Sequence, residues 1–469
     1  MADFNFKKWN LILGWFAFLI AFITYSLTVE PTVSFWDAGE YILTSSKLQV
    51  GHPPGAPFFQ MMGAFFSIFA TDPTQIGLMI NMMSATASAF TILFMFWSIV
   101  LLIKQVVMNN NESSKGQNAA ILGAAFVGSL SFAFTDSFWF NAVETEVYAM
   151  ATLIMAVLFY LGLRWGNDMF TPRGNKWLIL ISFVVGLSFG VHFMGLLTIP
   201  AIGLIYYFKN YKTITVKNFV LANLAGIAVL LFVFKLLAPN ILRYFSALEI
   251  FFVNSVGLPF NSGSIIAFVL LVGFIIFGIS FTRKKNYVNL NTALLCITFV
   301  VVGFSSWLML PIRANANVTV NENNPSSARE LLAYYNLEQY PKTHLFYGPQ
   351  FTDQYAGLDE NQPYIDDKPK YEKDKTLGKY VIVNDYKNGL QHYNSKHASL
   401  LPRMWSSEHA ENYMMYSGFL DFSVKTDYQM QNDLRSVIND FKNSVANGEV
   451  DYEDYHSFLK KYGRYIDIE

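Results

Sequence analysis

Nine apolar runs dominate this sequence, and they restrict the fold more than any other feature. Most have close to the roughly 20 residues that a helix needs to cross a hydrocarbon core of about 30 Å. Because 53% of the residues are hydrophobic and only 14% are charged, the pattern predicts a mainly α-helical, polytopic membrane protein. The candidate spans lie near residues 11–29, 76–103, 119–135, 147–163, 177–191, 193–208, 218–237, 264–281 and 290–311.

The apolar stretch 57–70 is too short to count as a tenth span, since its residues rise only about 21 Å as a helix. If it does not cross and the N-terminus is cytoplasmic, 13 Lys and Arg residues fall in cytoplasmic segments, against Lys47 and Arg243 in outer loops. A full crossing would reverse every later loop and remove this asymmetry. The positive-inside rule therefore predicts nine spans and a C-terminal domain outside the cytoplasm.

The charge of the chain divides near Arg313. Residues 1–314 carry a net charge of +6 and residues 315–469 a net charge of −7. We expect a membrane domain at 1–314 and a small mixed α/β soluble domain at 315–469, with a strand at 379–386 and helices at 326–340 and 428–446. The sequence has no basic stripe of the kind that predicts nucleic-acid binding. Its single cysteine excludes a disulfide framework.

Acidic residues of the membrane part gather on the predicted outer face. In the stretch "FWDAGEY", Asp37 and Glu40 have the spacing that places two side chains on one face of a helical turn. Such a pair can contain a general base, but a helix cap beside a solvated acid has the same pattern. In "GHPPGAP", His52 could contact a phosphate, a hydroxyl or a metal, or could cap the following helix.

A second acidic stretch, "NAVETEVYAM", precedes the span at 147–163. Glu144 and Glu146 are two residues apart, so a helix would direct them to different sides. An acid at the entrance of a membrane helix indicates a functional site, although stabilisation by the helix dipole is the alternative. His192 lies at the tip of the hairpin formed by the spans at 177–191 and 193–208.

Cations near the same face are candidates for binding a phosphate. Arg313 could form bidentate hydrogen bonds with a lipid phosphate, or serve only as an interfacial anchor. Lys235 and Arg243 are weaker candidates. The sequence leaves open a divalent metal ion bound by Asp37, Glu146 and His52, and it identifies no cofactor. Since no nucleotide-binding motif occurs, a transferase of this kind would need a donor that is already activated and membrane-borne.

Several motifs together resemble one family. They are "WDAGEYILTSSKLQVGHPPGAPFF", "NAVETEVYAM", "GLSFGVHFMGLL" and "LPIRANANVTVNENNPSSARELLAYYNLEQY", followed by "LFYGPQF". The chain is similar to a Bacteroidota family of multispan membrane proteins, formerly of unknown function, that is related to the vertebrate plexin O-mannosyltransferase. Members of this family are regarded as glycosyltransferases of the GT-C type.

The resemblance implies an inverting transferase of the bacterial inner membrane. Its donor would be a polyprenyl-phosphate sugar, with mannose expected, and its acceptor a protein hydroxyl. The general base maps onto Asp37, with Glu40 beside it, while His52 and Glu146 also fall on motif positions. The resemblance extends to Glu144 and His192 less directly. Family members continue into further spans, so the periplasmic domain is expected to be shortened here.

Two other classes of function are compatible with parts of the sequence. A transporter or secretion component would carry charges in the middle of its spans and an inverted repeat, and neither pattern is visible. A GT-C transferase that acts on a lipid or polysaccharide would differ only in its acceptor.

Overall fold

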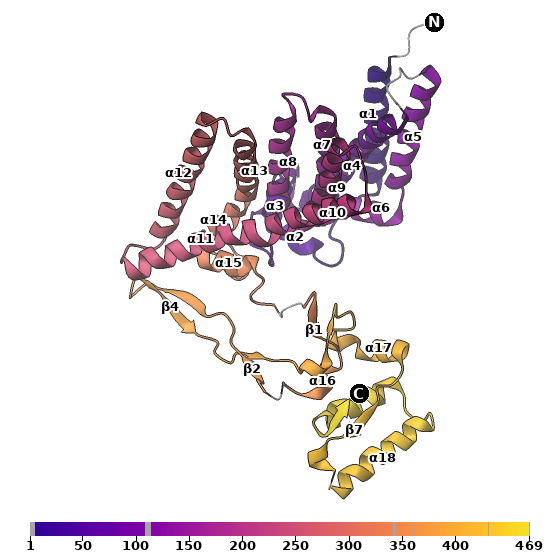
Figure 1. The fold of residues 1–469 in the computed structure, drawn as a ribbon, viewed down its shortest axis with the longest axis vertical. Coiled ribbons are helices and arrows are strands. Elements are labelled where there is room, and N and C mark those ends of the chain that lie inside the picture. The colour runs from indigo at the N-terminus through magenta and orange to yellow at the C-terminus, as the bar shows by residue number, and fades with distance from the viewer. Residues whose placement is uncertain (1–4, 108–113, 341–343, 360, 430, 469) are drawn as a thin grey trace. The chain divides into compact units, whose positions relative to one another are not determined.

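The structure is a computed structural model that describes residues 5–107, 114–340, 344–359, 361–429 and 431–468. The chain forms two compact units, Met1–Gln339 and Tyr340–Glu469. The first unit is almost entirely helical, and the second combines short strands with helices (Figure 1). The prediction of a mainly α-helical membrane protein with a small mixed C-terminal part is confirmed.

Within the described residues, six helical segments are long and apolar enough to cross a membrane. A seventh is obtained if α5 and α6, which are bent by 70° at their junction, form one span. The predicted hairpin of short spans corresponds to α8 and α9, which are shorter than a typical span. The long helices of this unit are α1 (Phe6–Thr28), α4 (Ile76–Val107), α5 (Lys115–Ala133), α7 (Val147–Asp168), α8 (Gly174–Ser188), α9 (Thr198–Asn210), α12 (Ser262–Lys284) and α13 (Val288–Phe304).

The region predicted as a span at 218–237 is part of a longer continuous helix. It includes α10 (Val216–Leu231), α11 (Ala238–Ile250) and the π-helical segments Phe232–Leu237 and Phe251–Ser255. In Figure 1 this helix runs across the direction of α12 and α13 rather than alongside them. Hydropathy alone could not reveal this, because the whole of 216–255 is apolar enough for a span.

Short helices occupy the connections between the long ones. The stretch 57–70, expected not to cross, forms an 11-residue helix, α3. Two further short helices follow α13 and lead to the end of the first unit. The bounds are α2 (Ala38–Ser46), α3 (Pro57–Ser67), α6 (Asp136–Ala142), α14 (Met309–Asn315) and α15 (Ala328–Tyr335).

Glycine contacts bring α8 and α13 close together. A Cβ at Gly186 would lie 2.2 Å from the Val300 carbonyl, and one at Gly303 would lie 2.3 Å from the Phe183 carbonyl. Small residues allow such backbone contact between membrane helices, where van der Waals packing drives association. The main core then continues through Trp307, which is buried and donates its indole N–H to the Phe189 carbonyl at 3.0 Å.

Within its described residues, the second unit has four antiparallel two-stranded sheets, paired β1–β6, β2–β5, β3–β4 and β7–β8. Its core surrounds Met414, Ile438 and Leu459, all fully buried. The predicted strand and both predicted helices are present as β4, α15 and α18, although α15 packs in the first unit. The elements are β1 (Tyr347–Pro349), α16 (Asp353–Ala356), β2 (Tyr364–Ile365), β3 (Lys370–Asp374), β4 (Lys379–Asn384), β5 (Leu390–Gln391), β6 (Ala398–Leu400), α17 (Ala410–Ser417), β7 (Phe422–Val424), α18 (Asn432–Ala446), α19 (Tyr452–Tyr462) and β8 (Ile466–Ile468).

Candidate active site

The candidate site begins at the N-terminus of α2. Asp37 is the N-cap residue of this helix and is exposed. Its side chain forms no capping hydrogen bond to any of the described residues. Glu40 follows in the first turn of the helix. The two carboxylates therefore share one face, as their spacing predicts. The preceding residues, Phe35 and Trp36, are 86% and 89% exposed, and Trp36 has a positive φ of 63°.

Glu40 holds His52 with both carboxylate oxygens. Its Oε1 accepts the backbone N–H of His52 at 2.6 Å, and its Oε2 lies 2.9 Å from Nδ1 of the ring. A Cβ at position 51 would lie 2.6 Å from Glu40 Oε1, so a larger residue there would displace this carboxylate. The H-P-P-G motif is therefore joined directly to the D-x-x-E motif.

This contact favours a charged pair. Burial opposes ionisation of Glu40, but the hydrogen bonds from His52 outweigh it and lower the pKa of the Glu40 carboxyl. The hydrogen bond to Glu40 raises the pKa of His52 against the effect of burial, with smaller help from Asp37 and Glu322. A carboxylate that is already paired is a poor free base, so the arrangement favours Asp37 over Glu40 for proton abstraction.

A second carboxyl group reaches the site from the start of α7. Glu146 is the N-cap residue of this helix and is 8% exposed. Burial first, and then the charges of Asp37 and Glu144, raise the pKa of Glu146 to about 7. A carboxyl group that titrates near neutral pH can both hold and release a proton.

Glu144 lies beside Glu146 and is also buried, at 6% exposure. The backbone N–H of Glu146 donates to the Glu144 carbonyl at 3.0 Å, so the two acids form part of one tight turn. Burial raises the pKa of Glu144. Glu144 therefore acts on the site through its charge and through the backbone of this turn.

Tyr41 lies among these acids. Burial raises the pKa of its phenol, and the charges of Glu146, Asp37 and Glu40 act in the same direction. Its ring also packs against His52, with centroids 5.7 Å apart. Its place next to Glu40 is the one feature of the sequence that distinguishes Tyr41 among 26 tyrosines.

Asn81 on α4 connects the segment after α1 with the turn that contains Glu144 and Glu146. Its amide donates to the carbonyls of Glu30 and Thr32 at 2.7 and 2.9 Å, and its oxygen accepts the hydroxyl of Thr145. Asn81 is fully buried. The first connection of the membrane unit and the start of α7 are thus held together by one side chain.

The segment after α14, near the C-terminal end of the first unit in sequence, also contributes to the site. Val50 and Asn321 form a parallel bridge, with the Val50 N–H donating to the Val320 carbonyl at 3.0 Å and the Glu322 N–H to the Val50 carbonyl at 3.1 Å. This pairing brings Glu322 beside Glu40 and His52, and burial raises the pKa of its carboxyl. Sequence reasoning missed Glu322, although it lies in the quoted "NENNP" motif.

Arg313 binds the other end of α2. Its Nε donates to the Leu48 carbonyl at 2.5 Å and its Nη2 to the Lys47 carbonyl at 3.0 Å. A guanidinium at this position satisfies carbonyls just beyond the end of the helix and complements its dipole. Arg313 therefore positions α2, and its planar fork has further N–H donors for a ligand.

Helix α15 packs on the H-P-P-G loop. The Tyr334 hydroxyl donates to the Gly51 carbonyl at 2.5 Å. Gly55, with a φ of +74°, passes so close to this ring that a Cβ would lie 2.8 Å from the hydroxyl. The loop is therefore held from both sides, by Glu40 and by Tyr334.

The remaining predicted residues make other contacts. His192 accepts the Met194 N–H at 3.1 Å through Nδ1, and its ring packs 5.4 Å from that of Tyr148. Lys235 and Arg243 are exposed residues of the long helix; Lys235 lies over the Phe234 ring and Arg243 donates to Asn240 at 3.2 Å. The structure brings together Asp37, Glu40, His52, Glu144 and Glu146.

The described residues contain no group of three or more His, Cys, Asp or Glu side chains arranged to hold a metal ion. The set of Asp37, Glu146 and His52, left open from the sequence, does not form such a group. His52 already directs Nδ1 to Glu40. We therefore derive no step through a metal.

Comparisons with known proteins agree with these motifs. Residues 37–215 match a family model described as Protein O-mannosyl-transferase TMEM260 N-terminal domain. Residues 341–435 match a Family of unknown function (DUF8416). The first range contains Asp37, Glu40, His52, Glu144, Glu146 and His192.

Two curated relatives carry the same name. Protein O-mannosyl-transferase tmem260 of Dictyostelium discoideum is 26% identical over 243 residues, which cover 48% of this chain and 28% of the relative. Protein O-mannosyl-transferase TMEM260 of Mus musculus is 24% identical over 164 residues, which cover 35% of this chain and 21% of the relative. No solved structure matches.

Fold and matches together define a multi-pass membrane protein with an acidic site at the start of α2 and α7. The chain is related to the plexin O-mannosyltransferase family, whose curated members here are named TMEM260. The matched region corresponds to about a quarter of the length of these relatives.

Proposed function

We propose that the chain is a membrane glycosyltransferase of the GT-C type that transfers a sugar, with mannose expected, from a polyprenyl phosphate to Ser or Thr hydroxyls of exported proteins. One observation carries the proposal: Asp37, Glu40, His52 and Glu146 come from three separate segments and form one cluster. All four lie within the range that matches the transferase family.

In this mechanism Asp37 accepts the proton of the acceptor hydroxyl as its oxygen attacks the anomeric carbon. The bond from that carbon to the phosphate oxygen breaks in the same step, and the lipid phosphate leaves. This single displacement inverts the anomeric configuration. Asp37 suits the role because it is exposed at the start of α2, and Glu40 is occupied by His52.

The other side chains prepare the site for this step. The Glu40–His52 pair fixes the loop next to Asp37. Glu146, with its pKa of about 7, can hold a proton within the acidic cluster and donate a hydrogen bond to the sugar or acceptor. We assign the lipid phosphate to Arg313, with Lys235 and Arg243 as further contacts, because the guanidinium has the opposite charge and carries N–H groups beyond those donated to Lys47 and Leu48.

The proposed setting is the bacterial inner membrane, with the N-terminus in the cytoplasm and the C-terminal part in the periplasm. The distribution of Lys and Arg supports this orientation. A reporter fused after Gln339, where the first compact unit ends, should be active only on the outer side. Activity on the cytoplasmic side would contradict the orientation.

The main test is Asp37→Asn in isolated membranes, with transfer of sugar from a polyprenyl-phosphate donor to an acceptor protein as the readout. We expect a loss of about 10²- to 10⁴-fold, the usual contribution of a positioned base. Asp136→Asn is the matched control, since Asp136 is another exposed acid at a helix N-terminus. Unchanged transfer by Asp37→Asn at normal expression contradicts the assignment.

A further inference from the structure

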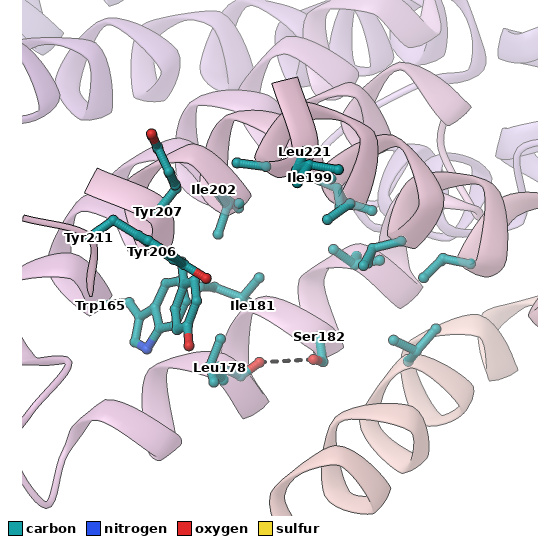
Figure 2. Close-up of a pocket in the computed structure, with 18 of the residues that line it drawn as sticks. Trp165, Leu178, Ile181, Ser182, Ile199, Ile202, Tyr206, Tyr207, Tyr211 and Leu221 are labelled. Carbon is teal, nitrogen blue, oxygen red and sulfur yellow. Dashed lines mark hydrogen bonds between the residues drawn. The ribbon is translucent and has the colours of Figure 1, made fainter. Parts of the chain in front are cut away.

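Exposed apolar side chains have a different meaning in the two units. In the membrane unit they are expected, because lipid covers the helices; Figure 2 shows one apolar cavity of that unit, between α8, α9 and α10, with Trp165, Tyr206 and Tyr207 at one side. In the C-terminal unit, none of the described helices is long and apolar enough to cross a membrane. A cluster of exposed apolar side chains there needs an explanation of its own.

Such a cluster lies at one end of the β1–β6 ladder. In this ladder Tyr347 pairs with Leu400, and the Leu401 N–H at its outer end donates to the Phe346 carbonyl at 2.7 Å. Phe346 is 74% exposed and Leu400 is 80% exposed. We call residues 345–347 and 400–405 the apolar tip. Its exposed large side chains are Leu345, Phe346, Tyr347, Leu400, Leu401, Met404 and Trp405.

The backbone holds the apolar tip away from the core of its unit. Gly348, at the inner part of the ladder, is buried, and the Phe351 N–H donates to the Met404 carbonyl at 2.7 Å. Phe351 itself belongs to the core around Met414. The two segments of the tip are thus attached to the core at one end and to each other at the other end. These attachments oppose an inward collapse that would hide the apolar side chains.

The apolar tip also differs in charge from the rest of its unit. Residues 340–469 contain 15 Lys and Arg and 20 Asp and Glu, whereas the tip has a single charged residue, Arg403, which is exposed. An apolar surface with one cation and no acid complements the anionic headgroups of a bilayer. Tyr347 and Trp405 are of the residue types that are enriched at the level of the headgroups.

The chain tethers the apolar tip to the membrane unit. That unit ends at Gln339, and Leu345 follows six residues later, a distance of at most about 20 Å when the chain is fully extended. A tethered surface needs only a weak affinity for lipid, because the link makes its effective concentration high. A separate protein partner lacks this advantage, and it would need a groove that matches the projecting tip.

We propose that the apolar tip inserts into the interface of the bilayer that holds the membrane unit, with Phe346, Leu400 and Leu401 against acyl chains and Arg403 against lipid phosphates. The insertion is shallow, about 5–10 Å, because the polar backbone of the tip stays near water. The C-terminal unit then has a second attachment to the membrane besides its covalent link. This attachment does not depend on sugar transfer.

Fluorescence quenching of the full chain in nanodiscs tests the proposal. Cys296, the single cysteine, is replaced by alanine, and an environment-sensitive fluorophore is attached at Leu400→Cys. Leu377→Cys is the matched control, because Leu377 is another exposed leucine of the same unit and lies in the turn between β3 and β4. Phe346→Cys is the second labelling position if Leu400→Cys does not give a monodisperse protein.

We expect nitroxide-bearing lipids to quench the fluorophore at position 400 at least fivefold more than the fluorophore at position 377. A nitroxide near the headgroup should quench more strongly than one near the end of the acyl chain. Equal quenching at the two positions overturns the proposal. Protection of position 400 from aqueous iodide without quenching by nitroxide lipids also overturns it, because protein rather than lipid then covers the tip.

A second substitution in the Leu400→Cys protein tests the apolar contact. Phe346→Gln should reduce quenching by nitroxide lipids at least threefold, because it removes a neighbouring ring from the inserted surface. Ile382→Gln is the control and should leave quenching unchanged, since Ile382 is an exposed apolar residue of β4 outside the tip. Quenching that Phe346→Gln leaves at the wild-type level contradicts the insertion.

The lipid composition tests the role of Arg403. In discs that contain phosphatidylglycerol, Arg403→Gln should lower the ratio of inserted to free tip about fivefold, the usual contribution of one cation near an anionic surface. In discs of phosphatidylcholine alone the ratio should change much less. A loss of equal size in both kinds of disc overturns the assignment of Arg403 to anionic lipid.

Discussion

Each unit of this protein holds one histidine against a single polar partner, and the two environments move the histidine pKa in opposite directions. In the membrane unit, the hydrogen bond to the Glu40 carboxylate raises the pKa of His52. In the C-terminal unit, His456 bonds to the Tyr355 hydroxyl, and burial followed by the charge of Lys460 lowers its pKa. The Glu40 carboxylate thus favours the charged form of one histidine, and burial favours the neutral form of the other.

Under the proposed function, the difference separates a network suited to chemistry from one suited to packing. Tyr355 and His456 lie in the core around Leu459, where a neutral hydrogen bond satisfies two polar groups at little cost. Glu40 and His52 are each 28% exposed and lie among other acids. A charged pair at an accessible position beside other acids can contact a substrate, which a buried neutral pair cannot do.

Removing the Glu40 carboxylate is expected to reduce sugar transfer more than any other change in the two histidine networks. Glu40→Gln should lower transfer by about 10²-fold or more, because His52 loses its charge partner and the loop beside Asp37 loses its anchor. The pH profile of the residual transfer should shift, since the pKa of His52 falls. Glu411→Gln, near His456, serves as the control and should leave transfer unchanged. A loss of activity without any change in the pH profile would indicate a purely structural role.

Glu146→Gln should separate stability from activity. A carboxyl group whose pKa is about 7 in the folded state and 4.5 unfolded lowers stability as the pH rises through this range, by at most about 3 kcal/mol at pH 8. The variant should therefore have a higher Tm than the wild type at pH 8, a similar Tm at pH 4, and reduced transfer. Thermal unfolding in detergent at both pH values measures this. A lower Tm at pH 8 would contradict the burial argument.

Tyr355→Phe should act only on the C-terminal unit. It leaves the buried His456 ring without its hydroxyl partner, at a cost of about 1–3 kcal/mol. Hydrogen exchange of the peptides from α19 should speed up, while those from α2 and α7 stay unchanged. Sugar transfer by this variant should stay unchanged. Slower transfer would show that the packing network also serves the reaction.

The smallest expected effect is a contrast in pH dependence. Stability contributed by His52 is complete below its ordinary pKa of 6.5 and is lost as the pH rises through its folded pKa. For His456 the sign is reversed, so that stability present above pH 6.5 is lost as the pH falls toward its folded pKa. Hydrogen exchange at several pH values, corrected for intrinsic rates, should show opposite trends in residues 47–59 and 452–462. Parallel trends would remove the distinction between the two networks.

The sequence predicted the parts of the site that depend on local pattern. Asp37 and Glu40 share a face because they lie in one helical turn, and the short stretch 57–70 formed a short helix as its length required. Their convergence with His52 and Glu146 followed from the resemblance and the charge distribution. The role of Glu144 as a neighbour of Glu146 rather than a second independent acid needed the turn geometry.

Features that depend on distant contacts could not be predicted. Glu322 reaches the site only because Val50 pairs with Asn321. Arg313 was chosen for a phosphate, but its hydrogen bonds to Lys47 and Leu48 follow from where α14 ends. The apolar cavity arises from the packing of α8, α9 and α10, and no periodicity along one helix encodes a space between three.

The pairing of Val50 with Asn321 also has a consequence for biosynthesis. The hydrogen bonds of Arg313 and Gln49 across this junction join residues 265 and 271 positions apart. At about 5–20 residues per second, the loop with His52 leaves the ribosome roughly 15 to 50 s before its partners exist. During that interval the loop that carries His52 lacks its pairing with residues 320–322, so the candidate site is the part of the membrane unit that is completed last.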